Sequence, residues 1–514
     1  MRSLILSVVV PALLSAIGAE PQASEAIDVP IGQRQLFLDD YGVAKTRGLQ
    51  RTMHQPEKKG AVVRPDQPWE LWLQTHCMPA WDEQQQIFKL WLLNCTPNPH
   101  EGGSTYVESK DGIHWTKPIL RQKKYQGSLE NNLLREPVLL HPSVVYDPND
   151  SDPNRRYKGL FFGPDNKNGD AMQPTVSPDG IYWKKLDVPK IPSMDESNLS
   201  YSPLTHTFIA TVKTLGPHGR SHAIWTSNDF EKWTKQDVVF SADDLDQKLG
   251  RKNIERCYAD PARKHPEYNI PSTYYVDVYN LGVFRYGGLY IGMPSMFHQT
   301  GKVSKDWDGF DKMPLTEEVK QSVRRSGDWT GFHHVQLACS RDLRQWTRLG
   351  ERRPFLDMSP AGGDAYDTQV ILPPSDAMVH GDELWFYYTG MRSYAIVSGP
   401  IPDQGAVCLA VLRRDGFISL DAGETPGTLL TKPFVVSGTE LFVNADAAGG
   451  NCKVEVLDGH NKALAVSEPV VGDQPHANVQ WKSGDLAGLK GQTVCLRFTL
   501  RNAKLYSFWL EDRK

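Results

Sequence analysis

The sequence predicts an all-β protein with a five-bladed β-propeller followed by a small C-terminal β-sandwich. Three observations lead to this prediction: a short phrase that ends in tryptophan recurs along the chain, each copy follows a strand-turn-strand unit, and the pattern stops near residue 425. The composition agrees, because 14 Trp, 42 Gly and 36 Pro in 514 residues favour many short strands joined by turns.

The first residues have the pattern of a cleavable secretory signal. Arg2 precedes an apolar run from Leu4 to Ile17, and small residues follow that run directly. The run is too short for a comfortable membrane span, and no cysteine stands directly after it to carry a lipid. We therefore expect a signal peptide over residues 1–23, a secreted or periplasmic mature protein, and no membrane anchor.

An aspartate lies four residues before a tryptophan in each copy of the phrase. The copies read SKDGIHW, SPDGIYW, SNDFEKW and SRDLRQW, with the pairs Asp111/Trp115, Asp179/Trp183, Asp229/Trp233 and Asp342/Trp346. Aspartate and glycine are typical of tight turns, and the tryptophan is expected to cover the edge of a sheet. Because four nearly identical sites cannot form one active centre, we interpret the phrase as scaffold rather than as catalytic or calcium-binding residues.

Each phrase closes a unit that contains an apolar strand, a turn and a second strand, and in most units an acidic residue precedes the first strand. In the clearest unit, DAYDTQVILPPSDAMVHGDELWFYYTG, Asp367 precedes the first strand and residues 380–382 form the turn. A fifth unit ends in VLRRDGFISL, which lacks the tryptophan. Five units predict five blades in a propeller domain at 24–424. Two insertions, around 241–270 and 299–330, are expected to form lids, rims or decoration.

The composition changes from residue 425 onward. The segments ELFVNADAAGGNCKVEVLDG and TVCLRFTLRNAKLYSFWL alternate apolar and polar residues, which predicts a β-sandwich over 425–514. The seven cysteines have no metal-binding spacing, so most are expected to be buried thiols. Cys452 and Cys495 could instead form one disulfide in an oxidising compartment.

Acidic residues stand at the start of the first strand in four of the five units. Since these strands begin near the central channel of a propeller, their first side chains converge on one mouth. Converging carboxylates are typical of glycoside hydrolysis, in which one attacks or activates water and another donates a proton. For any single acid, the alternative is a structural role in binding strand-start amides or pairing with arginine. The predicted catalytic residues are Glu70, Asp195, Glu196, Asp277 and Asp367.

A carbohydrate is the expected partner of these acids. The histidine spacing supports no metal site, and no nucleotide-binding or nucleophile-elbow motif stands in a suitable context, so neither metal nor cofactor is expected. A formal net charge of −4 gives no indication of nucleic acid as a partner, and the sequence leaves the oligomeric state open. The candidates for substrate binding are Arg135, Glu136, His141, Tyr279 and Asn280.

Several segments resemble a known group of proteins. They include RQLFLDDY (34–41), RTMHQPEK (51–58), RRYKGLF (155–161), VYNLGVFRYGGLYIG (278–292) and ELWFYYTG (383–390), and they cover nearly the whole mature chain. The sequence resembles the glycoside hydrolase family 32/43 superfamily, and more closely the secreted family 32 N-terminal-domain proteins of planctomycete-type bacteria. The resemblance implies a five-bladed propeller with a pocket that hydrolyses O-glycosyl bonds. The family 32 nucleophile, RDP and EC segments have no recognisable counterpart here, so the catalytic prediction rests on position within each blade.

Two functions fit these observations. The first is a secreted glycosidase in which two of the strand-start acids act on a glycan. The second is a catalytically inactive propeller that binds carbohydrate. A sialidase fits less well, because it would need an arginine triad and usually six blades.

Overall fold

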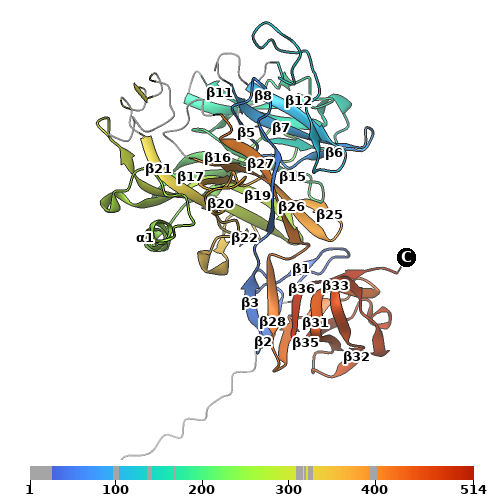
Figure 1. Ribbon diagram of the computed structural model, residues 1–514. Helices are drawn as coiled ribbons and strands as arrows, with labels where there is room; N and C mark the ends of the chain where they lie inside the picture. The colour runs from blue at the N-terminus through green and yellow to red at the C-terminus, as the bar shows by residue number, and fades with distance from the viewer. Residues whose placement is uncertain are drawn as a thin grey trace, which may run out of the picture.

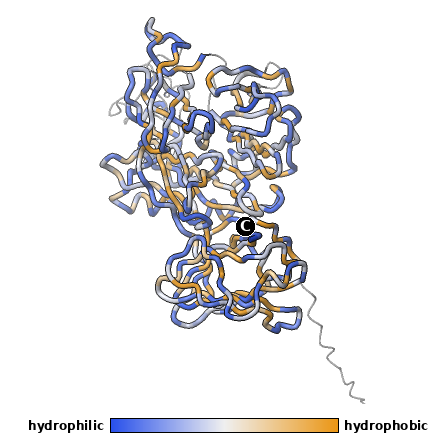
Figure 2. Tube along the Cα trace, turned by 90° about the vertical axis from the view of Figure 1, so that its right-hand side faces the viewer, coloured by the Kyte–Doolittle hydropathy of each residue, from blue (hydrophilic) through white to orange (hydrophobic). Residues whose placement is uncertain are grey.

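The protein consists of a ring of five antiparallel sheets and a separate sheet of twelve strands (Figure 1). The computed structural model describes residues 26–513 except for 97–102, 136–141, 166–168, 308–316, 318–319, 322–323, 325–327 and 394–401. Figure 2 shows the ring and the separate sheet from the side, with hydrophobic and hydrophilic residues alternating along many strands. The predicted five-bladed β-propeller is therefore confirmed.

The first three blades follow one another along the chain. Blade 1 contains β5 (Trp72–Gln74), β7 (Ile87–Cys95), β8 (Gly103–Ser109) and β9 (Trp115–Thr116), with β6 (Ala80–Asp82) beside β7. Blade 2 contains β10 (Val144–Tyr146), β11 (Tyr157–Asp165), β12 (Gly169–Ser177) and β13 (Lys184–Lys185), with β14 (Ile191–Pro192) beside β12. Blade 3 contains β15 (Ser197–Ser202), β16 (Thr207–Gly216), β17 (Gly219–Ser227) and β18 (Thr234–Phe240).

The last two blades complete the ring. Blade 4 contains β19 (Tyr275–Tyr286), β20 (Leu289–Val303), β22 (Ala338–Ser340) and β23 (Thr347–Arg348), with β21 (Asp328–Val335) beside β20. Blade 5 contains β24 (Val370–Leu372), β26 (Glu383–Met391), β27 (Gly405–Arg413) and β4 (Glu57–Val63), with β25 (Met378–His380) beside β26. Because β4 comes from the N-terminal part of the chain, blade 5 joins distant segments and closes the ring, which protects its outer edge.

The tryptophan phrase forms the turn after the third strand of blades 1 to 4. In blade 1, the Asp111 carboxylate accepts hydrogen bonds from the amides of Ile113 (2.9 Å) and His114 (2.8 Å). The Trp115 indole N–H donates to the carbonyl of Gly112 at 2.9 Å. The aspartates of the other three copies accept from the equivalent amides. These aspartates therefore have the structural role expected of them.

The turn of blade 2 also packs against blade 1. Gly180 has φ +82°, and a Cβ atom there would lie 2.4 Å from Cζ2 of the buried Trp91. We expect Gly180→Ala to lower the free energy of unfolding by about 2–5 kcal/mol, from left-handed strain plus overpacking. Gly381→Ala is the matched control, because Gly381 has φ +59° but no atom within 4 Å of that Cβ position. Urea denaturation that gave equal losses for both variants would contradict this packing.

The C-terminal domain is a twelve-stranded sheet folded around its own hydrophobic core. Its long strand β31 (Glu440–Leu457) pairs first with β36 (Ala503–Glu511) and then, beyond a register shift, with β35 (Thr493–Arg501). This change of partner lets β31 pass between two layers, as a sandwich requires. The remaining C-terminal strands are β28 (Ile418–Ala422), β29 (Gly427–Thr431), β30 (Phe434–Val435), β32 (Ala463–Ser467), β33 (Val470–Asn478) and β34 (Trp481–Ser483).

N-terminal strands complete this sheet, which departs from the expected division at residues 424 and 425. The strand β1 (Gln35–Leu36) pairs with β36, β2 (Val43–Arg47) with β29, and β3 (Gln50–Met53) with β28. Residues 35–53 and 418–422 therefore belong to the C-terminal sheet rather than to the propeller. The last, tryptophan-free copy of the phrase marks the point where the chain leaves blade 5.

Six of the seven cysteines are free thiols in the structure: Cys77, Cys257, Cys339, Cys408, Cys452 and Cys495. Cys452 pairs in register with Leu500, and Cys495 pairs with Leu457, so the two cysteines lie at different positions along the β31–β35 ladder. Both are unpaired in the structure, and the alternative of a disulfide between them is not realised. Burial raises the pKa of the Cys452 thiol to about 12.

Helices are few among the described residues. In the first insertion, α1 (Asp244–Ala259) begins with a capping box, because Asp243 accepts from the amide of Asp246 and the Asp246 side chain accepts from the amide of Asp243. Asp246 also forms an ion pair with Arg348 at 3.1 Å, which holds the helix against blade 4. Short 3-10 helices occur at Pro153–Arg155, Pro271–Thr273, Gly350–Arg352 and Ala487–Leu489.

Candidate active site at one mouth of the propeller

A buried lysine joins two of the predicted acids at the start of β15. Lys213 Nζ lies 2.8 Å from Oδ2 of Asp195 and 4.0 Å from Oε2 of Glu196. The two carboxylate oxygens are therefore at most about 7 Å apart. The Asp195 side chain is 40% exposed and the Glu196 side chain only 4%, so Asp195 is the one open to a ligand.

Glu196 lies in the central channel, where it contacts three blades. Gln74 of blade 1 donates to Oε1 at 3.3 Å, and Asn280 of blade 4 donates to Oε2 at 3.1 Å. His76 Nε2 lies 4.0 Å from Oε2. These neighbours fix the carboxylate in position and place the predicted binding residue Asn280 beside a predicted catalytic residue.

Tyr279 forms the centre of a cluster of aromatic and cationic groups. The pairing of β19 with β20 shifts register between Val278 and Asn280, so Tyr279 is the extra residue of a β-bulge. Such bulges re-aim side chains. Lys213 Nζ lies 4.0 Å from the centre of the Tyr279 ring, the His333 ring centre lies 4.7 Å away, and the Arg220 guanidinium lies 5.5 Å away. A half-buried tyrosine in this place can contact the face of a sugar ring.

Asp277 is joined to this cluster through Arg220. Its Oδ2 atom accepts from Arg220 at 3.0 Å and from Gln299 at 2.9 Å, while Oδ1 has no hydrogen-bond partner among the described residues. Burial raises the pKa of Asp277 to about 6, and Arg220 opposes the rise. A carboxyl group of this kind is protonated in mildly acidic solution and can donate its proton.

Glu70 and Asp367 have cationic partners from outer strands of their own blades. Lys117, which directly follows β9, lies 2.5 Å from Glu70 Oε2, and that oxygen also accepts from the amide of Asp66 at 3.1 Å. Lys58 of β4 lies 2.5 Å from Asp367 Oδ2, to which the Tyr388 hydroxyl donates at 2.8 Å. These contacts match the structural alternative for strand-start acids, and they do not join either residue to the cluster around Tyr279.

The predicted binding residues that precede blade 2 are not part of the Tyr279 cluster in the described structure. The Arg135 guanidinium lies 5.3 Å from the ring centre of Tyr182, and its exposed side chain is on the outer part of the blade. Glu136 and His141 lie outside the described residues.

Several groups of this site were not predicted from the sequence. Lys213 and Arg220 come from β16 and β17, and neither belongs to a recognisable motif. Glu267 belongs to the first insertion, where burial raises its pKa. The insertion is anchored at this end of the propeller, since Thr300 and Thr330 donate to the carbonyl of Tyr268 at 2.6 and 2.8 Å.

The fold and the mouth site define a β-propeller with clustered carboxyl groups. In the part of the chain that the structure describes, no group of three or more metal-ligating side chains is present, and no helix is long and apolar enough to span a membrane.

No family model and no curated protein matches this chain. Solved structures that it matches include one described as a glycoside hydrolase, with 13% identity, coverage of 70% of this chain and 92% of that chain, and a TM-score of 0.39. Another is a thermostable family-43 glycoside hydrolase, with 13% identity, coverage of 72% and 96%, and a TM-score of 0.35. A third is the GH32 β-fructofuranosidase of Bombyx mori, with 9% identity, coverage of 88% and 95%, and a TM-score of 0.40. Because identity and TM-score are low in each case, the proposed function is argued from the residues of this chain's own site.

Proposed function

We propose that this protein is a secreted glycoside hydrolase whose reaction takes place over Tyr279. The observation that carries the proposal is the pairing of Asp195 with Lys213 and of Asp277 with Arg220, the two cations of the Tyr279 cluster, in different electrostatic surroundings. Lys213 faces Asp195 at 2.8 Å, whereas burial raises the pKa of Asp277 to about 6. Two carboxyl groups of different acidity are what the hydrolysis of a glycosidic bond requires.

In this proposal, Asp277 is the proton donor. Its proton passes to the glycosidic oxygen as the bond to the anomeric carbon breaks. A water molecule attacks that carbon from the opposite face and gives up a proton to Asp195. The Glu196 carboxylate stabilises the positive charge that develops on the sugar ring, Lys213 holds the Asp195 carboxylate in position, and Tyr279 positions the ring. Glu267, in the insertion, is a second carboxyl group whose pKa burial raises.

The alternative is a propeller that binds carbohydrate without cleaving it. One observation favours it: Asp277 is only 2% exposed, so its carboxyl group must become accessible for a proton to reach a substrate. A binding protein would keep the Tyr279 platform and would need no accessible proton donor.

A hydrolysis screen separates the two functions. The full chain, recovered from the culture medium so that its first residue also tests removal of residues 1–23, is incubated with a library of glycans and chromogenic glycosides. We expect released sugar with at least one substrate, and a loss of about 10²-fold or more in kcat for Asp195→Asn. Asp187→Asn, an exposed acid of blade 2, is the matched control and should keep full activity. Glycan binding without hydrolysis would support the inactive propeller instead.

A further inference from the structure

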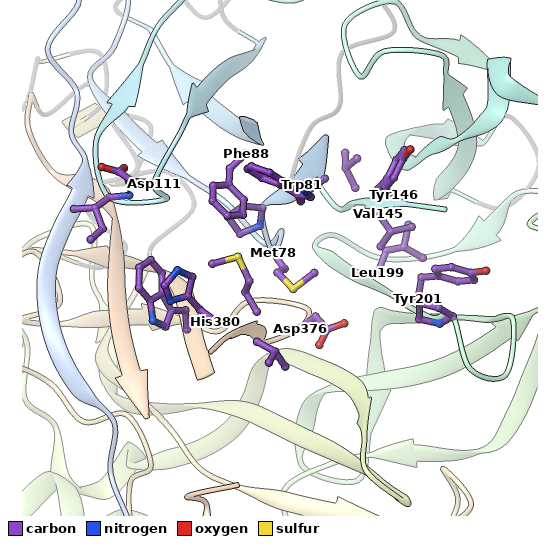
Figure 3. Close-up of a pocket in the computed structure, with 18 of the residues that line it drawn as sticks. Met78, Trp81, Phe88, Asp111, Val145, Tyr146, Leu199, Tyr201, Asp376 and His380 are labelled. Atoms are coloured by element: carbon purple, nitrogen blue, oxygen red, sulfur yellow. Dashed lines mark hydrogen bonds between the residues drawn. The ribbon is translucent and has the colours of Figure 1, made fainter. Parts of the chain in front are cut away.

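A cavity lies at the opposite end of the propeller from the candidate active site (Figure 3). Its volume is about 970 Å³, and side chains of blades 1, 2, 3 and 5 line it. The strand β15 shows the relation between the two ends: Asp195 and Glu196 precede its first residue, whereas Leu199, Tyr201 and Pro203 at its other end line the cavity. The cavity is therefore distinct from the candidate active site.

The walls of this cavity are mainly aromatic and aliphatic. The indole N–H groups of two lining tryptophans are already satisfied, since Trp81 donates to Glu83 at 2.6 Å and Trp385 donates to Glu383 at 2.7 Å. The rings thus offer apolar surface and π-electron density rather than hydrogen bonds to a ligand. Other wall residues are Met78, Phe88, Tyr146 and Met378.

One carboxyl group, that of Asp376, lies among these apolar side chains. Asp376 Oδ1 accepts from the amide of Ala377 at 2.7 Å, and no ion pair joins Asp376 to any described residue. Asp376 itself is half-buried, and six more deeply buried carboxylates of the protein do have a cation within ion-pair distance. They are Glu70 with Lys117, Asp147 with Lys158, Asp246 with Arg348, Asp277 with Arg220, Asp367 with Lys58, and Asp415 with Arg34. The cavity therefore has a site for a positive charge that the chain itself does not fill.

We propose that this cavity binds a small apolar organic cation, an amine or ammonium compound whose charged nitrogen pairs with Asp376 while its hydrocarbon part contacts the aromatic wall. Aromatic rings attract cations through their faces, and a carboxylate adds direct charge complementarity. The volume is suited to a ligand of this size, because small-molecule sites commonly enclose about 300–1,000 Å³. The proposal does not depend on glycoside hydrolysis at the other mouth.

The protonation of Asp376 gives this proposal a specific signature. Burial raises the pKa of Asp376 to about 8, so the carboxyl group without ligand is mostly protonated near neutral pH. An ammonium group favours the carboxylate, and its binding should therefore release a proton and grow tighter as pH rises toward 8. The other titratable groups of the lining are Tyr146 and Tyr201 and, at the exposed rim, Lys110, Asp111 and His380.

Calorimetric titration with a matched pair of probes tests the proposal. The full chain is titrated with 3-phenylpropylamine and with its neutral counterpart 3-phenyl-1-propanol, near pH 6.5, in two buffers of different ionisation enthalpy. We expect saturable binding of the amine with proton release, and weaker binding of the alcohol. Asp376→Asn should lower the affinity for the amine at least about 10-fold and remove the proton release. Asp187→Asn should bind both probes as the wild type does.

A second variant keeps the test decisive if Asp376→Asn folds poorly. Met78→Trp places a larger side chain in the cavity and should weaken binding of both probes, while circular dichroism verifies the fold. Equal affinity for amine and alcohol, amine binding that Asp376→Asn leaves unchanged, or no saturable binding of the amine to the wild type would each overturn the proposal.

Discussion

Asp277→Asn is expected to lower kcat for glycan hydrolysis by about 10²–10⁴-fold, the usual contribution of a general acid. The wild type should also lose kcat/KM as pH rises through about 6, because the pKa of Asp277 is raised to that value and only the protonated group can donate. In the variant, any residual activity should lack this falling limb. A pH series of initial rates for wild type, Asp277→Asn and Asp187→Asn tests the loss of kcat, the falling limb of the wild type and the absence of that limb in the variant.

The same substitution should have the opposite effect on stability. A carboxyl group whose folded pKa is raised stabilises the native state below its unfolded pKa, near 3.8, and that contribution is lost as pH rises through about 6. Between about pH 4 and pH 7, the wild type should therefore lose up to about 3 kcal/mol relative to Asp277→Asn. Parallel urea titrations at the two pH values provide the comparison.

The hydrolysis assay also has an outcome that would contradict the assignment of Asp277. If Asp277→Asn keeps its activity and Glu267→Gln loses it, the proton donor is Glu267 instead.

The second large effect is expected at the junction between the propeller and the C-terminal sheet. Asp415, at the end of blade 5, is fully buried and forms an ion pair with Arg34, whose guanidinium lies 3.8 Å from the centre of a Trp509 ring. It also accepts from Ser507 of β36 at 2.5 Å and from Tyr286 of blade 4 at 2.6 Å. One carboxylate thus connects two blades and the sheet.

Asp415→Ala is expected to lower the free energy of unfolding by about 3–5 kcal/mol, because it leaves the guanidinium of Arg34 buried without its counter-charge. Chemical denaturation followed by both tryptophan fluorescence and circular dichroism measures the loss. Asp382→Ala changes an exposed acid in the turn of blade 5 and should stay within about 0.5 kcal/mol of the wild type. A loss below about 1 kcal/mol for Asp415→Ala would show that the junction does not depend on this ion pair.

The repeat in the sequence was sufficient to predict the blades, because the same turn chemistry recurs in each copy. Asp111 and Asp179 bind equivalent amides, and these local hydrogen bonds are visible as sequence spacing. The domain boundary was less predictable. Pairing between β3 and β28 joins residues near 50 to residues near 420, and no local pattern encodes such a long-range pairing.

The candidate site could be predicted only in part for the same reason. Strand position identified all five acids, but their partners decide which of them belong together. Lys117 and Lys58 reach Glu70 and Asp367 from outer strands that are distant in sequence. Asp376 was not among the predicted site residues, because only the packing of four blades places it in a cavity.

The most direct measurement of the central claim is a crystal structure of Asp277→Asn in complex with a substrate identified in the hydrolysis screen. We expect a sugar ring over Tyr279, with the glycosidic oxygen at hydrogen-bond distance from residue 277 and the anomeric carbon facing Asp195. A saccharide bound only at the opposite end of the propeller, or bound at this mouth with its glycosidic bond remote from both residues, would contradict the account.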